Sequence, residues 1–120
     1  MFIQRFLLGI LPIISTCILA ESPDCESWPT NMAFVHLKNA GITTNDLIEF
    51  DKTEVVKLLS GLDRYDEQHN INIHRQIHRI TFHEKTGKEI TVITVNDASV
   101  VECSMSGVEV YVVTDKLGGR

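Results

Sequence analysis

The C-terminal half of the chain alternates apolar and polar residues with a period of two, which is the side-chain period of a β-strand. Strands are expected at 73–84, 89–96 and 108–114. Lys85-Thr86-Gly87-Lys88, between the first two, predicts a tight turn in which Gly87 supplies positive φ. Because the connections are short, this pattern predicts an antiparallel sheet.

A helix is expected before the sheet. Its apolar residues recur at helical spacing, as Ala33, Phe34, Leu37 and Ala40. Ser27 is a plausible N-cap, Pro29 is tolerated in the first turn, and Gly41 provides a left-handed residue at the end. The segment 47–62 fits a helix by spacing, and 53–59 also fits a strand with a bulge, which we favour. The polar stretch 61–72 is expected to be a loop or a frayed hairpin end.

These elements predict an α+β fold, with one N-terminal helix packed on a three- to four-stranded antiparallel sheet. Residues 1–20 are not counted in it, because they have the parts of a secretory signal peptide: a cation at Arg5, an apolar core, and Ala20 before the acidic Glu21. The remaining residues, 21–120, are enough for a single small domain. The mature protein is then expected to be periplasmic or secreted, with no membrane span. Lipoprotein processing at Cys17 is an alternative.

Export changes how Cys25 and Cys103 are interpreted. An oxidising compartment favours a disulfide between them, which would close a long loop, and two buried free thiols are the alternative. Zinc is not expected, since there is no CxxC motif. No cofactor is expected.

The charge argues against some partners. The chain has 11 Lys and Arg residues against 16 Asp and Glu, a net charge of −5. Nucleic acid and anionic lipid would both favour a basic surface. A cationic protein partner is compatible with this charge, as is simple solubility.

Two sets of residues could carry chemistry. His74 and His78 would lie at a metal-compatible spacing on a helix, but on a strand their Cα atoms are about 13 Å apart. Asp97, with a nearby serine and a histidine, could form a Ser-His-Asp set, but the chain has no GxSxG elbow. Asp97 and Ser99 are better explained as side chains that bond the backbone at a strand end. An enzyme is not expected.

The segment from Cys103 to Tyr111 is the candidate for binding a partner. A loop held by a disulfide loses little entropy on docking, Ser104, Met105, Ser106 and Gly107 offer adaptable contacts, and Tyr111 offers an anchor. The alternative is that Ser106-Gly107 is only the turn before the last strand.

The stretches HRQIHRITFHEKTGKEITVITVNDASVVECSMSGVEVYVV and DCESWPTNMAFVHLKNAGI resemble a family of small exported proteins of Gram-negative bacteria, a likeness that implies no particular activity. Ser106, Gly107 and Tyr111 resemble the Ser-Gly loop and tyrosine-bearing strand with which periplasmic lysozyme inhibitors of the membrane-bound, C-type group reach into the lysozyme cleft. The expected helix is not part of that family's all-β barrel. In size, export and acidity the chain resembles periplasmic immunity proteins.

The sequence therefore predicts a non-enzymatic, exported protein-binding domain, an inhibitor or immunity protein whose partner is a toxin or a hydrolase. The alternative is a small envelope enzyme or metal-binding protein that uses His74, His78 and Asp97.

Overall fold

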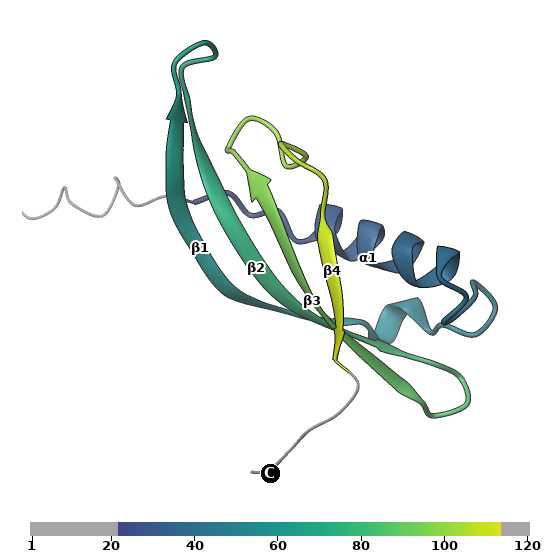
Figure 1. Cartoon of the computed structure of the whole chain (residues 1–120). Coiled ribbons are helices and arrows are strands. Elements are labelled where there is room, and N and C mark those ends of the chain that lie inside the picture. Colours follow the sequence, from purple (N-terminus) through teal and green to yellow (C-terminus); the bar gives the residue numbers. More distant parts are fainter. Residues whose placement is uncertain (1–21, 114–120) are drawn as a thin grey trace, which may run out of the picture.

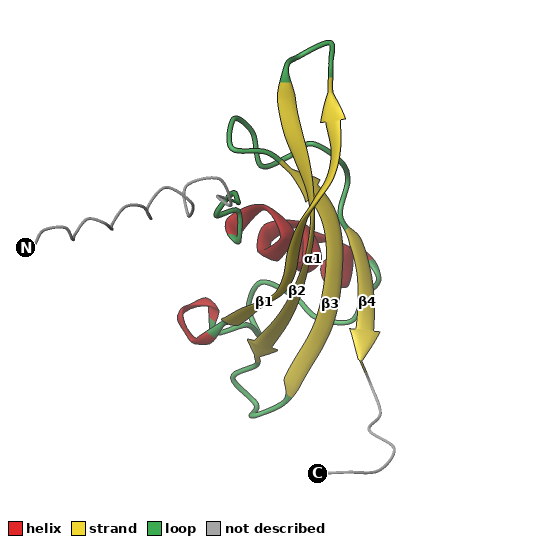
Figure 2. Ribbon diagram, turned by 90° about the vertical axis from the view of Figure 1, so that its left-hand side faces the viewer, coloured by secondary structure: helices red, strands yellow, loops and turns green. Residues whose placement is uncertain are grey.

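The computed structural model describes residues 22–113. One α-helix lies against one face of a four-stranded antiparallel sheet (Figures 1 and 2), so the expected α+β arrangement is confirmed. The elements are α1 (Ser27–Asn39), the short 3-10 helix η3 (Phe50–Lys52), β1 (Glu54–Asp66), β2 (Ile71–His83), β3 (Glu89–Ala98) and β4 (Glu109–Val113). The proposed signal peptide, its cleavage position and Cys17 lie outside the described residues.

The strands follow one another in the sheet in the order β1-β2-β3-β4, each antiparallel to the next. The β2–β3 hairpin pairs without a register shift from His74↔Ala98 to His83↔Glu89. Its turn contains Gly87 at φ +98°, as the sequence predicted. The N–H of Gly87 donates to the Glu84 carbonyl at 2.9 Å.

The segment that fitted both helix and strand is a strand. β1 contains register shifts between Lys57 and Leu59 and between Leu62 and Arg64. Of the two alternatives for 61–72, the loop is wrong and the segment is a hairpin end, because β1 and β2 pair through most of it and leave only 67–70 as the turn. The polar sequence hides this pairing because main-chain bonds, and not apolar side chains, form the end of the hairpin.

Helix α1 ends as expected and begins one residue earlier than expected. Glu26, not Ser27, occupies the N-cap position, and no side chain caps it. At the other end Gly41 has φ +77°. The N–H of Ile42 donates to the Leu37 carbonyl and that of Gly41 to the Lys38 carbonyl, which is the bond pair of a Schellman motif.

The apolar core lies between α1 and the inner face of the sheet, by which we mean the face that packs on α1. Its buried residues are Ala33, Phe34, Leu37, Ile48, Ile80, Phe82, Ile90 and Val92. Phe34 contacts Phe82 and meets Phe50 edge to face, with ring centroids 5.0 Å apart. No helix or second sheet among the described residues covers the opposite, outer face (Figure 2), although Ile73 and Asp97 on that face are buried.

The disulfide between Cys25 and Cys103 is present, as predicted. It joins the segment before α1 to the loop between β3 and β4, over a sequence separation of 78 residues. Cys25 is buried, so the bond anchors residues 22–26 on the sheet.

Replacing both cysteines by serine is expected to destabilise the fold by about 4 kcal/mol, because the unfolded chain regains the entropy that a long closed loop removes. Denaturant unfolding measures this loss. As a control, a reducing agent should lower the stability of the natural protein and leave the double variant unchanged. Equal stability of the natural protein with and without reductant would show that the bond contributes nothing.

Candidate protein-binding surface

The loop 99–107, between β3 and β4, is tied down at both of its ends. At its start the Ser99 Oγ accepts bonds from the N–H groups of Val101 at 3.2 Å and Glu102 at 3.0 Å. Near its end the Met105 N–H donates to the Asp97 carbonyl. With Cys103 bridged between these points, the loop is held in one shape. Ser99 therefore bonds the backbone as the sequence predicted.

Two valines project from this rigid loop. Val100 and Val101 are 66% and 70% exposed, the highest values among the exposed large apolar residues of the described chain. Beside them, a hollow of about 270 Å³ separates the loop from the segment that begins at Ser22. An exposed apolar pair on a rigid support can anchor a partner at a low entropic cost.

The sequence-predicted contact residues are divided between two places. Ser104, Met105, Ser106 and Gly107 lie in the loop, whereas Tyr111 lies on β4 and faces the outer side of the sheet, opposite to the core-packed Val110. Ser104 is exposed and donates its hydroxyl to Glu102. The Tyr111 Oη donates to Glu109, which raises the pKa of the phenol.

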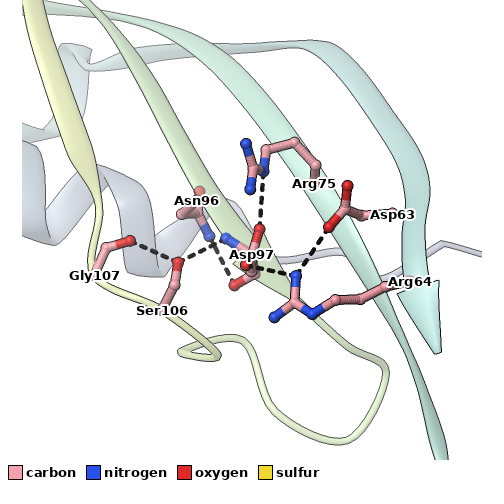
Figure 3. Close-up of polar contacts among 7 residues, drawn as sticks. All are labelled: Asp63, Arg64, Arg75, Asn96, Asp97, Ser106 and Gly107. Carbon is pink, nitrogen blue, oxygen red and sulfur yellow. Dashed lines mark hydrogen bonds and ion pairs between the residues drawn. The ribbon is translucent and has the colours of Figure 1, made fainter. Parts of the chain in front are cut away.

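Ser106 is used inside the molecule. Its Oγ accepts from the Asp97 N–H at 2.8 Å and donates to the Gly107 carbonyl at 2.7 Å (Figure 3). Its carbonyl accepts from the Trp28 indole N–H. Ser106 thus positions the loop, while Gly107 and Ser104 are exposed.

Asp97 joins this loop to the outer face of the sheet. Its carboxylate accepts from Arg75 Nε at 2.9 Å and from Arg64 Nη1 at 3.2 Å, as Figure 3 shows. Both arginines are half-exposed while Asp97 is buried. The hydrogen bonds that Arg64 donates to Asp63 and Asp97 raise its pKa, and the bond that Arg75 donates to Asp97 raises the pKa of Arg75. The expectation that the Asp97 side chain bonds the backbone is therefore wrong, because two guanidinium groups from β1 and β2 reach it.

We expect Asp97→Asn to lower the stability by about 1 kcal/mol, since it removes charge-assisted hydrogen bonds to half-exposed partners. Thermal unfolding in low and high salt measures the effect, which should shrink as salt screens the pairs. Asp63→Asn is the control, because Asp63 contacts Arg64 from an exposed position and its loss should change little. An equal loss in both variants would contradict a special role for Asp97.

A polar patch occupies the half of the inner face that α1 does not cover. Its buried residues are His74, Gln76, His78, Thr94 and Asn96, which come from the adjoining strands β2 and β3. Gln76 Nε2 donates to the Pro23 carbonyl at 2.8 Å, and Lys57 Nζ donates to the same oxygen at 3.2 Å. The segment 22–26 therefore covers this patch, which sequence reasoning did not predict.

His78 has more buried polar atoms without a hydrogen-bond partner than any other member of the patch. It is fully buried, and neither ring nitrogen has a hydrogen-bond partner among the described residues. Lys57 and Thr94 are its cross-strand neighbours. Burial lowers the pKa of His78 below its ordinary value of 6.5; nearby Lys57 also lowers it, while Glu26 and Asp24 act in the opposite direction.

Stability is expected to fall as the pH decreases below about 6.5. There the unfolded chain binds a proton at residue 78 more readily than the folded protein does, so acid favours unfolding. The melting temperature measured from pH 7 to pH 5 checks this, and His78→Gln should flatten its decline. His36→Gln, at an exposed position of α1, is the control and should keep the natural slope. Identical slopes in all three proteins would rule out His78 as the cause.

The structure does not bring together the residues of the enzymatic or metal-binding alternative. His74 and His78 face inward, whereas Asp97 is paired with arginines on the outer side. No group of three or more His, Cys, Asp or Glu residues within 22–113 is arranged to hold a metal ion.

Comparison with protein-family models, with curated proteins and with solved structures finds no match for this chain. No helix in the described range is long and apolar enough to cross a membrane. The surface must therefore be interpreted from its own residues.

Sequence reasoning missed Val100 and Val101. A signal was present, because two adjacent valines next to Cys103 break the alternation of the neighbouring strands. Such a pair in a loop has no sheet face on which to be buried.

Proposed function

We propose that this protein is an exported, periplasmic protein-binding domain that acts as an inhibitor or immunity protein toward a toxin or a hydrolase. The observation that carries the proposal is the pair of exposed valines on a loop held by a disulfide and by Ser99. A rigid loop with an apolar tip fits a partner's cleft, which is where an inhibitor of an enzyme acts.

Three further features support this proposal. The signal-like segment 1–20 and the Cys25–Cys103 disulfide both agree with an oxidising compartment. The uncovered outer face of the sheet adds Tyr111 as an aromatic anchor that a partner could contact. The acidic net charge of −5 favours a cationic partner.

The test is capture from an envelope extract by the immobilised, disulfide-bonded protein, followed by an activity assay of the captured protein. We expect a hydrolase or toxin to be retained at several salt concentrations and its activity to fall in proportion to added protein. Val100→Asp with Val101→Asp should abolish capture, because two buried carboxylates would lack partners in an apolar cleft. Tyr111→Ala should weaken it.

Val56→Asp provides the matched control, since Val56 is 41% exposed and lies on β1 opposite Arg79, which pairs with Ile93 and not with the end of β3 that leads into the loop. It should leave capture unchanged, and all variants should melt cooperatively. Retention of the same partner by the double aspartate variant would overturn the assignment of the loop. Failure to retain any protein would count against the function itself.

A further inference from the structure

A groove lies between the C-terminal half of α1 and the free edge of β4. It has a volume of about 430 Å³ and is lined mainly by apolar residues: Leu37, Ala40, Ile42, Val110 and Val112. Val112 is 39% exposed although it faces the same side as the core. The inner face of the sheet is therefore left uncovered between β4 and the C-terminal half of α1.

The position of α1 explains this opening. Figure 1 shows α1 continuing past β4, the last strand of the sheet. A helix packed on a sheet normally buries its apolar face against strands beneath it. Here Ala40 and Ile42 are exposed, and no strand within residues 22–113 lies under this end of the helix beyond β4.

The two edges of the sheet differ in how they are protected. β1 carries two register shifts and the charged residues Lys57, Asp63 and Arg64, all of which discourage further pairing. β4 pairs with β3 without a register shift, and after Glu109 it contains only valine and tyrosine. Within Val110–Val113 there is no charged residue, proline or register shift, and no described residue pairs with the outer main chain of β4.

We infer that the β4 edge accepts a fifth strand, donated as an extended segment by the protein partner. Its main chain would pair with β4, and its alternate side chains would be apolar and fill the groove beside Leu37 and Ala40. Its other side chains lie on the outer face, where Glu109 and the acidic net charge favour lysine or arginine. This inference rests on the proposed protein-binding function and specifies part of the surface that the partner contacts.

A second copy of this chain fits the edge less well. If two β4 strands paired about a twofold axis, the helices would lie on the same side of one continuous sheet, and each would extend toward the other's last strand (Figure 1). Neighbouring strands are only about 4.8 Å apart, whereas packed helices need 8–10 Å, roughly. The helix ends would therefore compete for one space, and a single extended segment avoids this conflict.

The experiment uses a short peptide of alternating lysine and valine, titrated to about 1 mM into the isotope-labelled, disulfide-bonded protein. Amide chemical shifts should change in β4 and in the C-terminal half of α1 and should saturate. A peptide of alternating glutamate and valine should bind at least about tenfold more weakly. A version with prolines in place of alternate lysines should not bind, because it lacks main-chain donors.

Val112→Lys and Val56→Lys form a matched pair, since the two valines are 39% and 41% exposed and lie on opposite edge strands. The first should weaken peptide binding at least about tenfold and the second should leave it unchanged, while both proteins melt as the natural one does. Absence of saturable shifts, or shifts confined to β1 or the outer face, would overturn the edge proposal. Dimerisation through β4 without peptide would assign the edge to a second copy and overturn it as well.

These results are separate from the capture test. A partner that is captured through Val100 and Val101 but is indifferent to Val112→Lys would leave the proposed function standing and remove only the fifth strand. If the natural protein captures no partner but still binds the lysine–valine peptide at β4, the proposed function is contradicted and strand addition at the edge is not.

Discussion

The bond between Cys25 and Cys103 holds together parts of the molecule that hydrophobic burial could not join. Helix α1 covers only the apolar half of the inner sheet face, around Ile80 and Val92. The other half is polar, and the segment 22–26 that covers it gains little from burying apolar surface there. Two bonds to the Pro23 carbonyl and the disulfide hold that segment in place. Without the covalent bond, the polar half of the sheet would be the first part to open.

The same bond determines the shape of the outward surface. Cys103 lies between Ser99, which folds the start of the loop, and Ser106, which ties its end to Asp97 and Trp28. β4 begins at Glu109, only a few residues later, so the clamp on the loop also fixes where the open edge starts. The position of the exposed valines and the start of the groove beside α1 thus both depend on the Cys25–Cys103 disulfide. A change at Cys25 would affect both, although it lies in a segment distant from them in sequence.

The sequence predicted the fold well where local patterns decide it. The alternation from Ile90 to Val95, the turn at Gly87 and the left-handed residue at Gly41 each specify a backbone conformation without tertiary information. β1 was harder to predict, because its bulges shift the alternation and its polar end pairs only through the main chain. The disulfide was predictable once residues 1–20, with Cys17, were set aside as a signal peptide, since the two remaining cysteines allow one pairing.

The site was less predictable than the fold because it depends on which face of each strand is covered. In β2 the apolar residues change phase, from Ile73 and Ile77 to Ile80 and Phe82, so the sequence alone does not identify the buried face. This change places His78 inside and leaves Arg75 free to pair with Asp97 across the outer face. Val100 and Val101 belong to no strand, and the sequence could not show that the surrounding bonds hold them outward.

The polar patch and the open edge have a common physical basis. A sheet of this size offers more inner surface than one helix of 13 residues can bury. At the polar end of β2 and β3 the excess is covered by the segment 22–26, and the residues there are His74, Gln76, His78, Thr94 and Asn96. Beside β4 no described residue covers the groove, and most of its lining is apolar: Leu37, Ala40, Ile42, Val108, Val110 and Val112. Apolar residues retained at an uncovered edge are a cost in the isolated molecule, because they expose surface that water disfavours and invite non-specific pairing. That cost is offset if a partner's strand completes the layer, which is why the composition of the two edges, and not only the gap beside α1, favours strand addition at β4.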